Sequence, residues 1–402
     1  FRSAVTLCNI ALAAGNLLLV YLLARRWLSD APLAVWLAVG LCVVDNSFAV
    51  WAVLGLEVHL LAFFMLLALW ASGSTLPQRR WILGAALLGA HLTRPDAGLF
   101  CAVLLANHAL DAWLEWRRGL RAEATARVAQ TLTAAGVWVV GYGAYFYLRY
   151  RYYGQLLPNT YYLKLGGPMD AWARGIAYLH GFLNERAFAP VLALCAGLAL
   201  RVPAIRALLV YNVLHAAYVV YVGGDFFAGH RFFVPEIPQL ALLSAVGAAE
   251  LARHANSARS AELLARAGIS SQHLVGAAAM ASACLLGVVF QRGVVRGPLQ
   301  GEVLTWGRDL TRQTRLFRWL GEQRLAEASI ATCLIGHTGF YSSARVIDMC
   351  GVIDPEVARR HVPNFGKGKA GHEKLASAAE TLAKHPTFIV QYIIPGDLWR
   401  YG

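Results

Sequence analysis

The amino-acid sequence predicts an all-α polytopic membrane bundle followed by a small C-terminal α/β domain. Of 402 residues, 58% are hydrophobic and 15% are charged, and the mean hydropathy is +0.49, which is too apolar for an ordinary soluble protein. Long apolar runs succeed one another up to about residue 290, and charged residues return after Gln291. We therefore expect a transmembrane domain at residues 1–291 and a soluble domain at 292–402.

Ten apolar runs are long enough, or nearly so, to cross a hydrocarbon layer about 30 Å thick. They occupy residues 4–24, 32–50, 58–72, 81–93, 97–114, 131–151, 188–200, 207–222, 234–252 and 273–290. Several are shorter than a full span, so we expect those helices to be tilted, packed inside the bundle or only partly spanning.

The basic residues predict the orientation of the bundle. The formal net charge of +13 could indicate nucleic acid, but the arginines fall in short clusters between apolar runs, as the positive-inside rule describes. We therefore attribute the charge to membrane topology and expect no nucleic-acid partner. The loops assigned to the cytoplasm contain Arg25 and Arg26; Arg79 and Arg80; Arg117, Arg118, Arg121 and Arg127; Arg201 and Arg206; and Arg253, Arg259 and Arg266.

The alternate loops then face outward and carry most of the polar chemistry. They are residues 51–57, 91–96, 149–167 and 223–231. Because all of them fall on one side, we expect them to converge on a single outward pocket. Both ends of the visible chain also fall outward, so we expect a further helix and an outer loop before Phe1.

The loop Gly223–Arg231 has the densest chemistry. Asp225, His230 and Arg231 lie within seven residues, together with three glycines, between two long apolar runs. A charge beside a bilayer needs a partner or water, so such a loop usually marks a site. The alternative is structural, with Asp225 paired to Arg231 to close the helix ends. We favour a site in which Asp225 supplies a carboxylate while His230 and Arg231 bind an anion.

Two earlier loops supply further candidates. Arg94-Pro95-Asp96 is expected at a turn between helices, where Arg94 either pairs with Asp96 or faces a phosphate, for which a guanidinium is well suited. Glu57 precedes an apolar run, so it either stabilises a helix N-terminus or belongs to the site. His59 lies two residues further along and could share that site.

The stretch 149–167 combines basic residues with five tyrosines, a density typical of the aromatic belt at a membrane interface. Tyr161 either belongs to that belt or lines a site. Pro158 interrupts regular structure, and Asn159 and Thr160 after it offer groups suited to sugar hydroxyls. Lys164 is a candidate for binding phosphate.

The last hundred or so residues predict alternating helices and strands. Helices are expected at 302–327 and 375–384, and strands at 329–335, 344–347 and 387–392. No cysteine spacing matches a metal site. Cys333 and Cys350 could pair outside the cytosol or remain free thiols.

Two motifs in this region favour structural roles. The stretch Asp348–Pro355 resembles a strand followed by a turn. A glycine-rich basic loop follows, which lacks the Ser/Thr and the spacing of a P-loop, so we expect it to be solvated. Its polar residues are Lys367, Lys369, His372 and Lys374.

Five motifs, in order, resemble bacterial membrane glycosyltransferases of the GT-C class. They are GLE, TRPD, YYGxLLPNTYYxK, GGDFxxGxRFxxPxxPxLAL and DxxGxxDP. The resemblance is to the terminal arabinofuranosyltransferases of mycobacterial cell-wall synthesis and to the arabinofuranosyltransferases that decorate type IV pilins. It extends along nearly the whole visible chain and implies a GT-C-like helical bundle.

The resemblance implies an inverting transferase of the bacterial inner membrane with its site facing the periplasm. A sugar, by implication arabinofuranose, would move from a polyprenyl-phosphate donor to a hydroxyl of a glycan or pilin-like protein acceptor. The family's general base, an aspartate in the first outer loop, would lie before Phe1. Asp225 and Glu57 are the visible catalytic candidates, and they could hold a divalent cation if one is used.

The resemblance and the residue chemistry together divide the remaining candidates by role. The expected phosphate-binding residues are Arg94, Lys164, His230 and Arg231, and the expected sugar or acceptor residues are Asn159, Thr160, Tyr161, Asp96 and His59. A transporter or flippase of lipid-linked sugars is the alternative. It would need polar groups through the bundle and symmetry between its halves, of which the sequence shows only Asp45. A non-catalytic lipid-binding or assembly subunit is the third possibility.

Overall fold

The computed structural model describes residues 2–165, 168–186, 193–255, 305, 311, 313–323, 327–363, 365–368 and 370–390. The expected span at 273–290, the expected domain boundary after 291 and most of the expected helix at 302–327 lie outside these residues. The chain divides into two compact units. The first falls within Phe1–Gly154, His180–Tyr218 and Gly229–Arg296, and the second within Gln155–Leu179, Val219–Ala228 and Gly297–Gly402.

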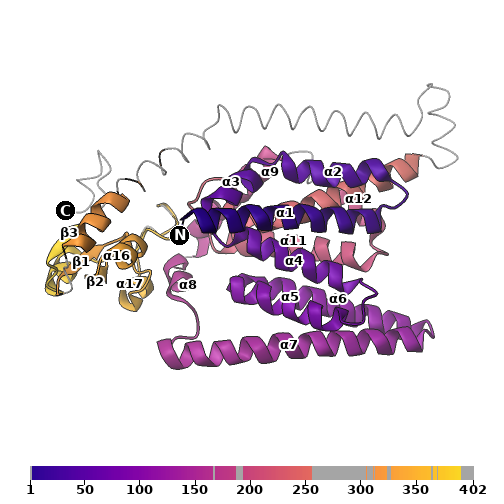
Figure 1. Ribbon diagram of the computed structural model, residues 1–402, viewed down its shortest axis with the longest axis horizontal. Coiled ribbons are helices and arrows are strands. Elements are labelled where there is room, and N and C mark those ends of the chain that lie inside the picture. Colours follow the sequence, from indigo (N-terminus) through magenta and orange to yellow (C-terminus); the bar gives the residue numbers. More distant parts are fainter. Residues whose placement is uncertain are drawn as a thin grey trace, which may run out of the picture. The chain divides into compact units, whose positions relative to one another are not determined.

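The first unit is a helical bundle, in which α7 runs alongside α5 and α6 (Figure 1). Its elements are α1 (Arg2–Trp27), α2 (Pro32–Val43), α3 (Asn46–Leu54), α4 (Val58–Ser72), α5 (Arg79–Thr93), η1 (Pro95–Ala97), α6 (Gly98–Arg117), α7 (Arg121–Tyr153), η2 (Ala196–Ala199), η3 (Arg231–Glu236) and α12 (Ile237–Ala255). Two further helices, α9 (Pro168–Glu185) and α11 (Pro203–Tyr221), contribute residues to both units.

Several of these helices have the length and composition of membrane spans. Within the described part of the chain, four qualify: Ser3–Trp27, Pro95–Arg117, Pro203–Tyr221 and Arg231–His254. The pair α2 and α3, bent by 53°, would make a fifth if it is one broken span. The helical, membrane-type character predicted from composition is confirmed to this extent.

The break between α2 and α3 has a local cause. Asp45 caps α3, because its carboxylate accepts a hydrogen bond from the backbone N–H of Phe48 at 2.9 Å. The same carboxylate binds Arg186, whose Nε lies 2.6 Å from Oδ2 and whose Nη2 lies 2.9 Å from Oδ1. The charge that interrupts the apolar run is thus paired inside the bundle, as intramembrane charges require.

Charged side chains gather at both ends of α6. In its C-terminal half, Asp111 accepts a hydrogen bond from Arg206 at 2.5 Å, and Asn107, one turn earlier at the middle of the helix, accepts another at 2.8 Å. The turn that carries Arg94 and Asp96 precedes its first residue. A 20-residue helix is about 30 Å long, close to the thickness of a hydrocarbon layer. The predicted inner and outer loops joined by α6 therefore lie at opposite ends of a helix of spanning length.

The second unit contains α8 (Asn159–Lys164) and a three-stranded parallel sheet in the order β2-β1-β3. The strands are β1 (Ser329–Thr332), β2 (Arg345–Asp348) and β3 (Phe388–Val390), each within or near a predicted strand, and the helices are α16 (Ile335–Tyr341), α17 (Pro355–Arg359) and α18 (Ala378–Ala383). The central strand β1 is buried along its whole length, and Ile330 packs with Phe317, Leu320, Ala328 and Ala344.

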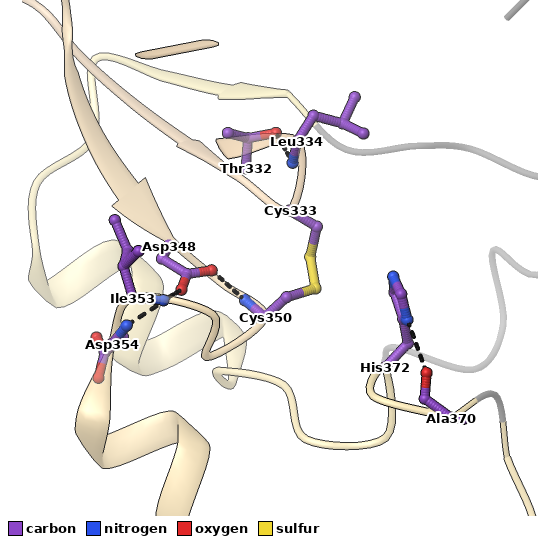
Figure 2. Close-up of a disulfide and its surroundings, with 9 residues drawn as sticks. All are labelled: Thr332, Cys333, Leu334, Asp348, Cys350, Ile353, Asp354, Ala370 and His372. Atoms are coloured by element: carbon purple, nitrogen blue, oxygen red, sulfur yellow. Dashed lines mark hydrogen bonds between the residues drawn. A yellow bond between two sulfur atoms is a disulfide. The ribbon is translucent and has the colours of Figure 1, made fainter. Parts of the chain in front are cut away.

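Cys333 and Cys350 form a disulfide that links the ends of β1 and β2 (Figure 2). Their Cα atoms are 5.2 Å apart. Beside the disulfide, the carboxylate of Asp348 accepts backbone N–H groups from Cys350 at 2.8 Å, Ile353 at 2.6 Å and Asp354 at 3.1 Å. The predicted turn after β2 is therefore held by a crosslink and a buried acceptor. Closing a loop of this size stabilises a fold by about 3 kcal/mol in the chain-entropy account.

Candidate functional site

Arg94 occupies the turn between α5 and α6. Pro95 cannot continue α5, so Arg94 takes an extended backbone conformation and its side chain turns into the bundle, where the residue is 8% exposed. Its Nε donates to Oδ1 of Asp96 at 3.0 Å, and its Nη2 donates to Oδ2 of the same carboxylate. The expected pairing within the turn is therefore present, and it leaves the far edge of the guanidinium for another partner.

The turn belongs to a larger cluster that includes residues of α11 and η3. His215 Nε2 lies 3.8 Å from Oδ2 of Asp96, and its Nδ1 lies 3.2 Å from Oε1 of Glu236. Tyr211, one helical turn before His215, donates its hydroxyl to the same Oε1 at 2.7 Å. We call Arg94, Asp96, Tyr211, His215 and Glu236 the Arg94 cluster. An ionisable cluster this deep in an apolar bundle indicates a functional site.

Three buried atoms of the Arg94 cluster have no hydrogen-bond partner among the described residues, and one of them, His215 Nδ1, still lies against Glu236 Oε1 at 3.2 Å. The other two are Arg94 Nη1 and Glu236 Oε2. Leaving a buried polar group unpaired costs about 1–3 kcal/mol, and more if it is charged. Such a cost is explained if a ligand fills the gap. The cluster therefore offers one spare donor and one spare acceptor.

Two other predicted residues lie near Arg94. Glu57 directly precedes α4, makes no side-chain capping bond, and attracts Arg94 electrostatically. Arg94 and Arg231 both contact the ring of Phe232, with the guanidinium carbons 4.8 Å and 5.5 Å from its centroid. The structure thus brings Glu57, Arg94, Asp96 and Arg231, from three of the four loops expected to face outward, into one region.

His230 has the left-handed backbone conformation, with φ of 50°. Its Nδ1 lies 3.3 Å from Oε2 of Glu185, which the sequence analysis did not consider. Burial acts to raise the pKa of Glu185, but the hydrogen bond and charge of His230 outweigh it, so that the pKa is lowered. This arrangement places a carboxylate beside the His230 ring at the start of η3.

His59 lies elsewhere in the bundle. It is fully buried, its Nε2 is 3.0 Å from the backbone carbonyl oxygen of Phe48, and its ring packs edge-on to that phenyl ring at 4.6 Å. Asn16 is 3.4 Å from its Nδ1 and also donates to its backbone carbonyl at 3.0 Å. With both ring nitrogens near protein partners, His59 has the surroundings of a packing residue.

The second unit contains the other predicted charges. Lys164, the last residue of α8, lies 3.6 Å from the carboxylate of Asp225, whose side chain is fully buried. Gly223 and Gly224 precede Asp225 with φ of 76° and 72°, values that favour glycine. A Cβ on Gly224 would come within 2.7 Å of Tyr178. The glycines therefore let the chain turn tightly and bring Asp225 to Lys164.

The predicted sugar-binding residues lie on α8. Asn159 is its first residue and is half-buried, whereas Thr160 is exposed. Burial, with contributions from Tyr221 and Tyr162, raises the pKa of Tyr161. The three side chains remain candidates by position, one to two helical turns before Lys164.

The basic loop near the C-terminus is solvated only in part, which corrects the expectation from its composition. Lys367 is exposed, but Lys374 is 2% exposed and donates to three backbone carbonyls. His372 packs edge-on to Phe226, with ring centroids 4.4 Å apart. Lys369 lies outside the described residues. Partners more than 200 residues away in the chain bury Lys374, whereas Lys367 and His372 stay exposed, so the composition of the loop was misleading for Lys374 alone among these three.

No group of three or more His, Cys, Asp or Glu side chains in the described ranges is arranged as a metal site. Asp225 and Glu57 lie in different units, and each carboxylate has a cationic neighbour, Lys164 for Asp225 and Arg94 for Glu57. The suggested divalent cation therefore stays a prediction.

Comparison with known proteins bears on the C-terminal part alone. Residues 306–400 match a family described as a domain of unknown function, DUF8728. No curated protein and no solved structure matches the chain.

Proposed function

We propose that the protein is an inverting glycosyltransferase of the bacterial inner membrane that takes a sugar from a polyprenyl-phosphate donor. In this proposal the chain forms a GT-C-like bundle of about ten spans, with the α/β region after residue 291 on the periplasmic side. The donor needs an apolar environment for its tail, cations for its phosphate and polar groups for its sugar. The apolar helices and the Arg94 cluster supply each of these.

The observation that supports the proposal best is the pair of unsatisfied atoms in the Arg94 cluster. A phosphate oxygen would accept a hydrogen bond from Arg94 Nη1, and a sugar hydroxyl would donate one to Glu236 Oε2. Arg231, on the other side of Phe232, adds positive charge for the phosphate. One phosphosugar thus satisfies both atoms with the donor and acceptor groups it contains.

The reaction would be a single displacement at the anomeric carbon. The acceptor hydroxyl oxygen forms a bond to that carbon while the bond from the carbon to the phosphate oxygen breaks, which inverts the configuration. The acceptor proton passes to a carboxylate acting as general base. The electron pair of the broken bond stays with polyprenyl phosphate, and Arg94 stabilises this developing charge.

Other residues keep their predicted roles within this proposal. Lys164, His230 and Arg231 contribute positive charge for the phosphate, and Asn159, Thr160 and Tyr161 contact the sugar or the acceptor. Asp225 and Glu57 orient the reacting groups. A glycan or a pilin-like protein supplies the acceptor hydroxyl.

Transport of a lipid-linked sugar is the second candidate. The buried carboxylates and the histidine on α11 and η3 favour it, because ionisable groups inside a bundle also serve as proton relays in transporters. Transfer needs an acceptor and breaks the sugar–phosphate bond, whereas transport leaves the donor intact on the other leaflet.

Purified protein in liposomes separates the two candidates. The donor is polyprenyl phosphate carrying labelled arabinofuranose, supplied with a soluble arabinan acceptor. The transferase proposal predicts labelled glycan and free polyprenyl phosphate, with both lost in Asp225→Ala and in Arg231→Ala. Intact donor that changes leaflet with no labelled glycan would identify a transporter instead.

A further inference from the structure

Two adjacent residues of the C-terminal family domain hold the two chain segments that carry Lys164 and Asp225. These residues are Glu373 and Lys374, in the segment Phe365–Lys374. Each binds a different segment, and all of these residues belong to the second unit.

Lys374 holds the segment that ends in Lys164. Its ammonium donates to the carbonyl oxygens of Tyr162 at 2.8 Å and Leu165 at 2.6 Å, on either side of Lys164. It also donates to the carbonyl oxygen of Ala358, in α17, at 2.8 Å. All three protons of the ammonium are used, so the end of α8 is fixed to the C-terminal domain at two points.

Glu373 holds the segment that leads to Asp225, and it acts through Arg174. One carboxylate oxygen accepts the backbone N–H groups of Gly366 at 2.7 Å and Gly368 at 2.8 Å. The other accepts Nη1 of Arg174 at 2.8 Å, and Nε of Arg174 donates to the carbonyl oxygen of Gly223 at 2.9 Å. Gly223 lies two residues before Asp225.

The loop itself lies close to the ion pair. A Cβ on Gly371 would be 3.9 Å from Cε of Lys164, and His372 packs against Phe226, the residue after Asp225. The segment Phe365–Lys374 therefore lies close to Lys164 and to the residue after Asp225, and it also fixes the two chain segments that carry this pair.

We propose that Glu373 and Lys374 are positioning residues, and that the domain of unknown function serves to hold Lys164 and Asp225 together for binding the phosphate of the lipid donor. This inference rests on the proposed function for its substrate. It also makes a claim about the protein alone, because losing either anchor should loosen one identified segment and leave the other in place.

The test uses the full-length protein in nanodiscs, with Lys374→Met and Glu373→Gln compared with the wild type. Lys367→Met is the matched control, because Lys367 is an exposed lysine of the same segment. Hydrogen exchange is measured at residues 155–165 and 219–228. We expect faster exchange at 155–165 in K374M, faster exchange at 219–228 in E373Q, and no change in K367M. Lys374→Arg should restore part of the protection, because a guanidinium can also donate to carbonyls.

Transfer kinetics provide the second readout. In K374M we expect a higher KM for the lipid donor and a fall in kcat/KM of about 10- to 100-fold, since misplacing a group by about 1 Å can cost that much. The unfolding temperature of the α/β region is measured in each variant, so that KM and kcat are expressed per folded molecule. Unchanged exchange at both segments, or equal loosening of both in each variant, would overturn the inference. If K374M fails to fold, E373Q alone decides it by the same criterion. If the variants show this exchange pattern but the wild-type protein shows no sugar transfer, the proposed function is overturned and the anchoring role of the two residues stands.

Discussion

Two buried arginines in the first unit bind an aspartate in the same way and differ at one atom. Arg94 and Arg186 are each 8% exposed, each pairs with an aspartate through Nε and Nη2, and each lies over a phenylalanine ring, at 4.8 Å and 4.3 Å. Arg186 uses every nitrogen, because its Nη1 donates to the carbonyl oxygen of Phe182 at 3.3 Å. Arg94 Nη1 has no such partner among the described residues.

The comparison separates a structural ion pair from a candidate binding site. Around Arg186, Asp45 caps α3 and the pair fixes the break in the helix, so all hydrogen-bonding capacity is used within the protein. Around Arg94, the second carboxylate, Glu236, also has an unused oxygen. Burial and pairing alone therefore do not distinguish the two arginines, whereas unused hydrogen-bonding capacity makes the Arg94 cluster the candidate site.

The largest expected effect is on Arg94. Arg94→Lys keeps the positive charge beside Asp96, but the ammonium places no N–H at the position of Arg94 Nη1, so we expect kcat/KM for sugar transfer to fall about 10²- to 10³-fold, as when one transition-state donor is lost. Lysine also cannot bind both oxygens of Asp96, so some loss of stability is expected and transfer is measured per folded molecule. Activity close to wild type would remove Arg94 from the donor site.

Glu236→Gln should have the next largest effect. Glutamine keeps an oxygen for Tyr211, but its amide nitrogen takes the place of the spare oxygen and the negative charge is lost. We therefore expect transfer to fall about 10- to 100-fold through the loss of a charged hydrogen bond. Glu250→Gln is the matched control, because Glu250 is equally buried on α12 but pairs with Arg201 and Arg253. Equal losses of activity in both variants would mean that the effect reflects buried charge in general.

Arg186→Lys should lower stability without lowering transfer. Lysine cannot bind both oxygens of Asp45 and also reach Phe182, so we expect the free energy of unfolding to fall by about 1–3 kcal/mol. Transfer per folded molecule should stay close to wild type. Denaturant unfolding followed by tryptophan fluorescence measures the first quantity, and the transfer assay measures the second. A selective loss of transfer would contradict the structural role.

An exposed pair completes the comparison and should have the smallest effect. Arg360 Nη2 lies 2.5 Å from Oε1 of Glu380, and this hydrogen bond, with those from Ser377, lowers the pKa of Glu380 to about 2. Because the folded pKa is below the unfolded value of about 4.3, the stabilisation is present above that value and is lost as pH falls through about 2. Hydrogen exchange of α18 from pH 6 to pH 2 should show this slight loss, and Glu380→Gln should abolish its pH dependence.

Sequence patterns point to the turn residues of the candidate site but not to their partners. Arg94 and Asp96 stand out because a proline and two charges interrupt apolar runs, and Glu57 stands out for the same reason. Tyr211, His215 and Glu236 lie inside apolar segments. A lone ionisable residue within a predicted span was a usable signal for His215 and Glu236, but their proximity to Asp96 depends on how α11 packs.

The C-terminal unit shows a different limit. Strand propensity predicted β1, β2 and β3 to within a few residues. The expected position of this region outside the cytosol made a disulfide between Cys333 and Cys350 one of two alternatives, and the structure contains it. The burial of Lys374 could not be predicted, because a glycine-rich lysine loop is normally solvated and its partners Tyr162 and Leu165 are distant in sequence. Local patterns determine elements, whereas a long-range anchor depends on the assembled unit.

The most direct test of the central claim is the structure of the protein bound to a non-transferable polyprenyl-phosphate sugar. The account predicts a phosphate oxygen about 2.7–2.9 Å from Arg94 Nη1, the distance of a charge-assisted hydrogen bond, with a sugar hydroxyl on Glu236 Oε2. A bound donor whose phosphate contacts neither Arg94 nor Arg231, with both spare atoms still unfilled, would contradict it.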